Sequence, residues 1–166
     1  MQAFLIFRSF HLLRNVELKP QRSIINEKRA SINSITTIIM QLLHTEITEK
    51  IIKSYYKVYN TLGYGFLEKV YEKAMVIELS KNGLEVKNQH PITVFYRNEI
   101  IGEYFADIIV NDLVIIELKA AMEISEEHEC QLINYLKATN IELGLLMNFG
   151  KEAEYKRKVF MNGYKP

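Results

Sequence analysis

The spacing of apolar residues along the chain changes from a helical period to a strand period and back. Between residues 45 and 81, apolar side chains recur every three or four positions, which predicts two amphipathic helices separated by Gly63 and Gly65. After Asn82-Gly83 the apolar residues run in short segments that are typical of strands. Strands are expected at 84–89, 92–96, 100–110 and 113–119, a third helix at about 125–138, and a last strand at 143–149.

Short polar pairs separate the predicted strands. Arg97-Asn98 and Asn111-Asp112 are expected to form tight turns, so the strands on either side of them pair as an antiparallel meander. The last strand follows a helix, and such a strand usually returns to the sheet parallel to its neighbour. Ser125 and Thr45 are expected to cap the third and the first helix. These elements form one α/β domain, followed at 151–162 by a polar, basic tail for which a helix is one interpretation.

Residues 1–39 differ in charge from the rest of the chain. They hold six basic side chains against two acidic ones, a balance of +4, whereas the remaining residues hold 15 basic and 18 acidic ones, a balance of −3. The basic bias and weak periodicity leave open a disordered extension, a transit peptide, or a start placed upstream of a native start at Met40. A further alternative is an extra helix over 32–43 that continues into the next one. The folded domain is therefore expected at 40–166.

The composition is that of a globular protein in a reducing compartment. Of the 166 residues, 48% are hydrophobic and 25% are charged, which is enough apolar material for one core. The single cysteine, Cys130, excludes an internal disulfide and a cysteine-based zinc site, so we expect a cytoplasmic protein. Charges interrupt every apolar run before the ~18 residues that a membrane span needs. A net charge of +1 gives no long-range attraction for nucleic acid, which must then bind through a local patch, metal cations or a partner.

The segment from Asp107 to Lys119 carries the strongest chemical signal. Glu117 and Lys119 lie two positions apart in a strand of β-branched residues, so both side chains point to the same face. Charged groups in a buried strand are costly unless they are paired, bound to metal or open to a cleft. The turn between the two strands would bring Asp107 opposite Glu117. Two acids and a lysine placed this way can hold a divalent metal and activate water, which is the chemistry of phosphodiester hydrolysis.

Five further polar residues become candidates for the site only when they are considered together with that segment. Glu68 and Tyr71 lie one turn apart near the start of the second helix, and Gln131 and Tyr135 lie one turn apart on the third. Taken alone, a helical Glu or Gln is most often a solvated side chain, and a helical Tyr is most often part of the core. Arg157 lies in a basic cluster that can hold a nucleic-acid backbone, although charge runs are commonly solvated faces.

The spacing Gly65-x-x-Glu68-x-x-Tyr71 resembles the signature of the GxxExxY proteins, a family of the PD-(D/E)XK nuclease superfamily. The resemblance extends in order through Gly102, Asp107, Glu117-Leu-Lys119, Gln131-Leu-Ile-Asn-Tyr135-Leu and the segment 144–150. It covers about 45–160 and implies a restriction-endonuclease-like fold with an αβββαβ core, in which helices flank a mixed central sheet. Ala106 stands where the superfamily name has Pro, a departure that many members share.

The resemblance also implies a metal centre. Asp107 and Glu117 would ligate Mg²⁺ or Mn²⁺, and Glu68 would complete the metal site. Lys119 would orient or activate the attacking water and stabilise charge on the phosphate. This assignment is consistent with electrostatics, because three neighbouring carboxylates repel one another and at least one should have a raised pKa without metal. A divalent cation reverses that preference.

The pair Gln131-x-x-x-Tyr135 resembles a helical pattern of the recombination-exonuclease branch of the superfamily. The resemblance implies that these residues contact the substrate or steady the site, with Gln131 counted as catalytic and Tyr135 as substrate-binding. Tyr71 and Arg157 are also expected to bind substrate, Tyr71 from the signature motif and Arg157 from the basic cluster.

Two functions follow from these observations. The first is a metal-dependent nuclease that hydrolyses phosphodiester bonds of DNA in defence, repair or mobile-element biology. RNA is a weaker option, because the chain lacks an aromatic-basic strand code. The alternative is a non-catalytic domain that keeps the nuclease fold and binds nucleic acid or protein, which the low net charge and small size favour. A core of this size is expected to need a second copy of itself or a partner protein to grip a substrate.

Overall fold

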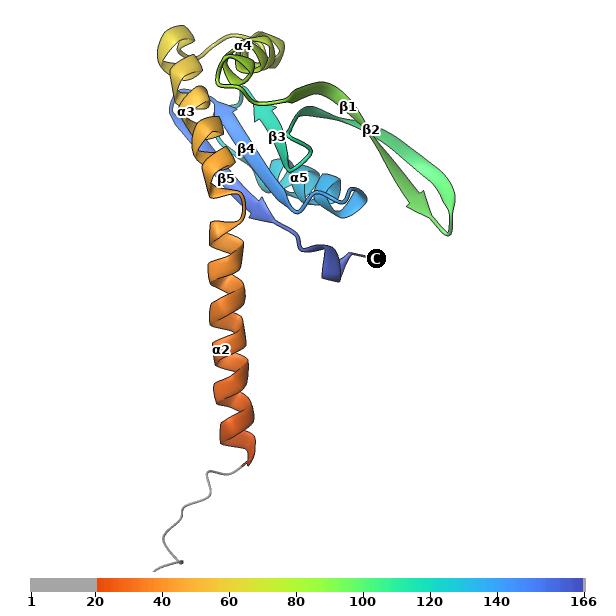
Figure 1. Cartoon of the computed structure of the whole chain (residues 1–166). Helices are drawn as coiled ribbons and strands as arrows, with labels where there is room; N and C mark the ends of the chain where they lie inside the picture. The colour runs from red at the N-terminus through yellow and green to blue at the C-terminus, as the bar shows by residue number, and fades with distance from the viewer. Residues whose placement is uncertain (1–20, 166) are drawn as a thin grey trace, which may run out of the picture. The chain divides into compact units, whose positions relative to one another are not determined.

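The computed structural model describes residues 21–165, with elements labelled as in Figure 1. Their order is α2 (Gln21–Leu42), α3 (Thr45–Leu62), α4 (Glu68–Lys81), β1 (Val86–Tyr96), β2 (Glu99–Val110), β3 (Val114–Lys119), α5 (Glu126–Ala138), β4 (Leu143–Phe149), β5 (Ala153–Val159) and a 3₁₀ turn (Asn162–Tyr164). The chain divides into two compact units between Leu42 and Leu43. None of the described helices has the length and apolar character to cross a membrane.

The described part of the first unit is α2, a single helix. It begins before the helix expected at 32–43, and it does not continue into α3, because His44 lies between them with a φ of 53°. The expected cap at Thr45 is wrong, since His44 takes the N-cap position and no side chain caps the helix. The Thr48 hydroxyl instead donates to the His44 carbonyl oxygen at 2.8 Å. The interpretations made for residues 1–20 lie outside the described residues.

Five strands of the second unit form one mixed sheet in the order β1-β2-β3-β4-β5. Neighbouring strands are antiparallel except for β3 and β4, which are parallel because α5 carries the chain back across the sheet. The predicted crossover is therefore confirmed. The turns predicted at Arg97-Asn98 and Asn111-Asp112 are confirmed as well, because all four residues have positive φ, as two-residue hairpin turns require.

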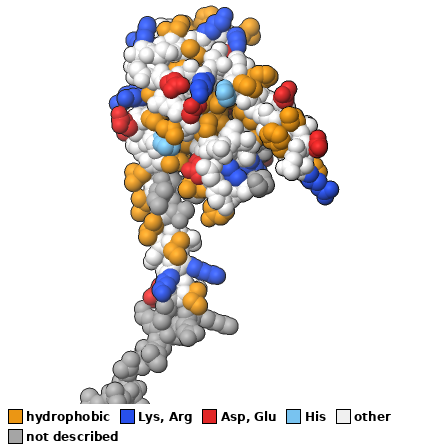
Figure 2. Space-filling view, turned by 45° about the vertical axis from the view of Figure 1, so that its right-hand side comes forward, with side chains coloured by type: hydrophobic (Ala, Val, Ile, Leu, Met, Phe, Trp, Pro, Cys, Tyr) orange, Lys and Arg blue, Asp and Glu red, His pale blue; other side chains and the backbone are white. Residues whose placement is uncertain are grey.

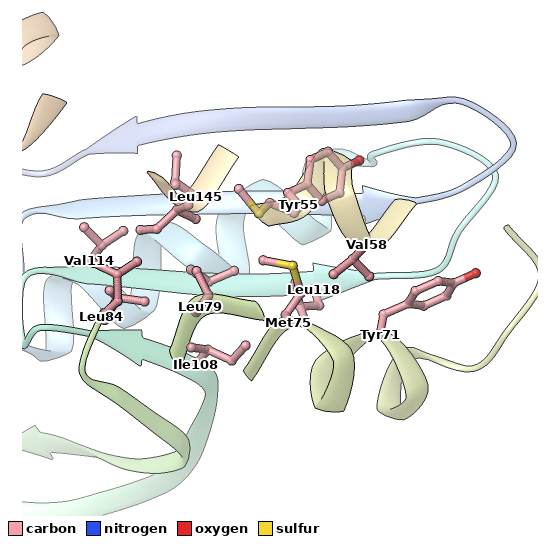
Figure 3. Packing of buried hydrophobic residues seen from close by; sticks show 14 of the residues in the cluster. Tyr55, Val58, Tyr71, Met75, Leu79, Leu84, Ile108, Val114, Leu118 and Leu145 are labelled. Carbon is pink, nitrogen blue, oxygen red and sulfur yellow. The ribbon is translucent and has the colours of Figure 1, made fainter. Parts of the chain in front are cut away.

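Helices cover both faces of this sheet and bury two separate hydrophobic cores (Figure 1). On one face, α3 and α4 pack over a core that contains Tyr55, Met75 and Leu145 (Figure 3). On the other face, α5 packs through a core around Leu132. Every residue of β4 is buried, because the strand lies between two neighbours and beneath helices on both sides. This position explains why its sequence is apolar except for Asn148.

Three aromatic rings pack together where α3 and α4 meet the end of β4. The Tyr71 ring stacks on Phe149 with 4.1 Å between ring centroids and 12° between ring planes. Tyr55 meets the same Phe149 ring edge-on, with 4.9 Å between centroids. The Tyr55 hydroxyl donates to the carbonyl oxygen of Asn148 at 2.5 Å. The three rings therefore fasten both helices to β4.

The two edge strands differ from what the sequence predicted. A single strand, β1, replaces the strands expected at 84–89 and 92–96. Gln89 has a positive φ, but the residues on either side of it remain paired with β2, so the strand continues. Pro91 is tolerated because β1 is an edge strand. The tail at 151–162 contains strand β5 rather than a helix. Its charged residues fit an edge position, where one side of the strand meets solvent.

β1 and β2 form a long hairpin that extends past the rest of the sheet (Figure 1), because β3 pairs only with residues 108–110 of β2. Figure 2 shows hydrophobic side chains gathered on this hairpin. The exposed large apolar residues of the hairpin are Phe95, Tyr96, Ile100, Ile101, Tyr104 and Phe105. Between the hairpin and α5 lies a groove of about 910 Å³, the hairpin groove, lined by residues such as Thr93, Tyr104, Gln131 and Tyr135.

Candidate active site

β2 and β3 separate at the position of two acidic residues. The last ladder pair between these strands joins Ile108 to Ile116, so Asp107 and Glu117 take the next positions. There the Leu118 N–H donates to Asp107 Oδ2 at 2.8 Å. The Asp107 side chain therefore closes the fork between the strands. The register is the one expected from the turn that joins them.

Glu117 and Lys119 share one face of β3 and are bonded to each other. Lys119 Nζ donates to Glu117 Oε1 at 2.7 Å, and the two side chains are only 12% and 3% exposed, the lysine being the more exposed. Glu117 Oε2 is buried and has no hydrogen-bond partner among the described residues. A buried polar group without a partner costs about 1–3 kcal/mol, and more when it is charged. Glu117 is therefore better explained as a binding group than as a stabilising one.

Burial and neighbouring charges shift the proton equilibria at the fork. Burial, with the charge of Asp107 next, raises the pKa of Glu117 from 4.5 to about 7, against the opposing effect of Lys119. Burial also raises the pKa of Asp107, although the Leu118 amide opposes it. Burial acts to lower the pKa of Lys119, but the bond to Glu117 and the charges of the nearby acids outweigh it and raise that pKa. A protonated lysine and a carboxyl that titrates near neutral pH thus lie side by side.

Helix α4 brings two further acids toward the fork. Glu68 is the first residue of α4, and its Oε1 accepts from the Ala120 N–H at 3.3 Å. Its charge also contributes to the raised pKa of Glu117, after burial and Asp107. Glu72 lies one turn later and is buried. Both glutamates and Asp107 line a groove of about 560 Å³, the acid groove.

Helix α5 places the predicted Gln131 and Tyr135 in the hairpin groove. Gln131 Nε2 donates to the Tyr135 hydroxyl oxygen at 2.8 Å. Burial raises the pKa of Tyr135, and the charge of Glu117 adds to it, so the hydroxyl lies within the electrostatic field of the fork. The Tyr104 ring of the hairpin lies 6.1 Å from the Tyr135 ring, measured between centroids. Gln131 and Tyr135 therefore approach the acids from the α5 side of the sheet.

The structure does not bring Tyr71 or Arg157 to the acids. Tyr71 is completely buried, and its hydroxyl donates to the Gly63 carbonyl oxygen at 2.9 Å and accepts from the Phe66 N–H at 3.2 Å. It thereby holds the loop from which α4 begins. Arg157 Nη2 donates to the Leu43 carbonyl oxygen at 3.0 Å, and both neighbouring lysines bind an acid of α5. The observed contacts of both residues are structural.

Sequence reasoning missed two polar residues that organise the site. Gln89 Nε2 donates to Glu72 Oε2 at 2.7 Å and to Asp107 Oδ1 at 3.2 Å. The available signal was the interruption of the strand pattern at Gln89, which resembles a strand end. Asn148, buried in β4, bonds both the N–H and the carbonyl oxygen of Ala121 and fixes the loop after β3. A lone amide in an apolar strand was the signal for it.

The donor atoms at the fork suit a hard divalent cation. Asp107, Glu117 and Glu68 offer carboxylate oxygens, which Mg²⁺ and Mn²⁺ prefer. The unpartnered Glu117 Oε2 is an oxygen of this kind. Within residues 21–165, no group of three or more acidic, His or Cys side chains is gathered closely enough to hold a metal ion by itself. Mg²⁺ does not need such a group, because it commonly binds one or two protein carboxylates and completes its shell with water and phosphate oxygens.

An αβββαβ domain with two acids and a lysine at the fork of its central strands defines a nuclease-like class of protein. The family model of the PD-(D/E)XK nuclease superfamily matches residues 45–159, and the chain belongs to this superfamily. The predicted superfamily and the predicted restriction-endonuclease-like fold are thereby confirmed.

Comparison with solved structures finds the crystal structure of SSO0001 similar to this chain at 16% sequence identity, with a TM-score of 0.47. The similarity covers 74% of this chain and 62% of that one, so this chain spans less than two thirds of the length of that structure's chain. Comparison with curated proteins finds no match.

Proposed function

We propose that this chain is a metal-dependent nuclease of the GxxExxY family that hydrolyses phosphodiester bonds of DNA, with Mg²⁺ or Mn²⁺ as cofactor. One observation carries the proposal. Glu117 is buried at the fork beside Asp107, with one oxygen bonded to Lys119 and the other without a partner among the described residues. Adjacent buried acids repel each other, and a divalent cation offsets that repulsion. The motif Gly65-x-x-Glu68-x-x-Tyr71 supports the family assignment. Its acid, Glu68, is the first residue of α4 and accepts from the Ala120 N–H next to the fork.

The residues at the fork have separate chemical roles. Asp107 and Glu117 would hold the cation, with Glu68 near them at the start of α4. When bound, a divalent cation polarises the phosphoryl group and makes water more acidic. Lys119 keeps its proton at neutral pH, because the bond to Glu117 and the surrounding acids outweigh its burial and raise its pKa. It therefore stabilises negative charge on the phosphate as an ammonium group and does not act as the base.

Gln131 and Tyr135 act on the substrate from the hairpin groove. Because the Tyr135 hydroxyl oxygen accepts from Gln131, its own proton can be donated to a phosphate oxygen. Burial raises the pKa of Tyr135, which keeps that proton in place at neutral pH. Gln131 fixes the direction of the hydroxyl. The pair therefore positions the phosphate next to Lys119.

The proposed partner and cellular location rest on the superfamily and on the sequence. Membership of a nuclease superfamily supports a nucleic acid as the partner. DNA is preferred over RNA because the sequence carries no motif typical of RNA-binding modules. A cytoplasmic location fits Cys130, an exposed free thiol that a reducing compartment preserves.

Cleavage of single-stranded and double-stranded DNA with Mg²⁺ or Mn²⁺ tests the proposal. We expect cleavage by the wild type and a loss of about 10²-fold or more in Lys119→Ala, because a charge that stabilises the transition state is removed. Lys53→Ala, which changes an exposed lysine of α3, is the matched control and should keep full activity. Calorimetry should show Mg²⁺ binding that Asp107→Asn abolishes. Equal inactivity of the wild type and Lys119→Ala, with metal-independent DNA binding, would instead identify a non-catalytic binding domain.

A further inference from the structure

We propose that Gln89 is a positioning residue for the reaction, because its side-chain amide bridges Glu72 and Asp107 and fixes the orientation of Asp107. The inference rests on the proposed nuclease function and adds a residue to its site. Gln89 lies outside the motifs on which the family resemblance depends. It lines the acid groove together with Glu68, Glu72 and Asp107, so it lies beside two of the proposed metal ligands.

The backbone at Gln89 is distorted directly opposite Asp107. The residues on either side of Gln89 pair regularly with β2, but Gln89 and Asp107 form no ladder pair. Gln89 has a φ of 50°, a conformation that residues with a Cβ seldom adopt and that persists only where the surrounding structure compensates for it. The side-chain alternation of β2 also breaks here, since Ala106 belongs to the core beneath α5 and Ile108 to the core beneath α3 and α4.

The distortion coincides with an amide that faces two carboxylates. Gln89 Nε2 donates to Glu72 Oε2 at 2.7 Å and to Asp107 Oδ1 at 3.2 Å. The other oxygen of Asp107, Oδ2, accepts from the Leu118 N–H at 2.8 Å. Both oxygens of Asp107 are therefore held, one from β1 and one from β3, at the point where β2 and β3 separate. A side-chain amide has two N–H groups and no charge, so it can serve two acids at once.

Glu72 gives this bridge a fixed anchor. It is 4% exposed, and Lys69 Nζ donates to its Oε1 at 2.8 Å and its Oε2 at 3.1 Å. Without the amide, Glu72 and Asp107 would lose the donor that they share. Asp107 Oδ1 would then lose its bond from β1, and the carboxylate would be free to turn away from the fork, which impairs a metal ligand.

Two substitutions separate the effect of the Gln89 amide from the effect of its backbone conformation. Gln89→Gly removes the amide, and glycine adopts this φ without strain, so the variant should fold at least as well as the wild type. Gln89→Leu removes the amide but keeps most of the side-chain volume. Asn88→Leu is the matched control, because it removes an exposed amide one residue earlier in β1. Thermal melting reports whether each full-length variant is folded.

Binding of Mn²⁺ by calorimetry and cleavage of DNA then test the proposal. We expect Gln89→Gly to weaken Mn²⁺ binding about tenfold or more, as is typical when a group that orients a metal ligand is removed. The kcat should fall while the KM for DNA changes little, and Asn88→Leu should match the wild type.

The outcomes separate this inference from the nuclease proposal. If the folded Gln89→Gly variant binds Mn²⁺ and cleaves DNA like the wild type, the positioning role is overturned and the nuclease function stands. If the wild type binds Mn²⁺ but cleaves no DNA, and Gln89→Gly weakens that binding, the nuclease function is overturned and the positioning of a metal ligand stands. If the wild type binds no Mn²⁺, both are overturned.

Discussion

Glu117 is a carboxyl group whose ionisation the folded protein opposes. Burial, followed by the charge of Asp107, raises its pKa from 4.5 to about 7. Between these two pH values the folded protein binds more protons than the unfolded chain, so the free energy of unfolding falls as pH rises. The stabilising contribution of the protonated group is complete below about pH 4.5 and is lost above about pH 7. Asp107, whose pKa burial also raises, adds a slope of the same sign.

Glu117→Gln should remove most of this pH dependence in metal-free protein. In the wild type, the group should lower the free energy of unfolding by up to about 3 kcal/mol between pH 4.5 and about pH 7, since one pKa unit corresponds to about 1.4 kcal/mol. Urea denaturation in the presence of a chelator measures this difference. Glu49→Gln, at an exposed position of α3, should keep the wild-type slope. An unchanged slope in Glu117→Gln would show that Glu117 ionises freely in the folded state.

Residue positions were predictable where strand period and turn length determine them. Glu117 and Lys119 share a face because side chains alternate along a strand, and the turn between β2 and β3 sets Asp107 opposite Glu117. Gln89 was not predictable, because its backbone conformation is understood only with Glu72 of α4 beside it. The burial of Tyr71 likewise depends on a ring from β4, which no local pattern indicates.

Helix α5 lies close to the sheet because β4 has a glycine beneath it. A Cβ at Gly144 would lie 2.7 to 3.0 Å from three side-chain carbons of Leu132, which is shorter than ordinary contacts. Leu132 is fully buried, so it has little freedom to move. Gln131, the next residue along the helix toward its start, lines the hairpin groove. The distance between α5 and β4 therefore also sets the position of one wall of that groove.

Gly144→Ala should lower the free energy of unfolding by about 1–3 kcal/mol, the usual effect of adding a carbon to a packed core. DNA cleavage should fall as well, because α5 carries Gln131 and Tyr135. Chemical denaturation and the cleavage assay measure the two effects. A second change, Leu132→Val, should recover part of the lost stability by making room. Gly163→Ala is the control, since a Cβ added at Gly163 would meet nothing within 4 Å. Wild-type stability in Gly144→Ala would show that α5 adjusts without cost.

Element types were predictable from local signals and less so at the edges of the sheet. The α5 cap is confirmed, because Ser125 accepts from the His128 N–H and the His128 side chain accepts from the Ser125 N–H. β5 was misjudged because its charged residues suit a solvated tail as well as an edge strand. Only its pairing with β4 distinguishes the two. The sequence predicted two strands in place of β1 for a similar reason. A proline such as Pro91 would interrupt a central strand, but it is tolerated in an edge strand.

The second unit of the molecule contains both hydrophobic cores and every residue of the candidate site. The superfamily match at 45–159 also falls within it. A fragment of residues 43–166 should therefore fold cooperatively and keep the cleavage activity of the full chain. A matched fragment that begins at His44 lacks Leu43, whose carbonyl accepts from Arg157 and whose side chain packs against the core, and should be less stable by about 1–3 kcal/mol. Thermal melting and the cleavage assay compare the fragments. An unfolded 43–166 fragment would contradict this division of the chain.

The aromatic cluster at the end of β4 also determines how this protein can be observed. The chain has ten tyrosines and no tryptophan, so indole absorption does not obscure the phenol bands. Tyr55, Tyr71 and Phe149 hold one another in fixed, asymmetric surroundings. Such rings give near-ultraviolet circular dichroism, which disappears when packing is lost even if helices persist. The protein therefore contains a label-free optical reporter of packing beside the helix that presents Glu68, readable in samples without DNA, whose bases absorb in the same region.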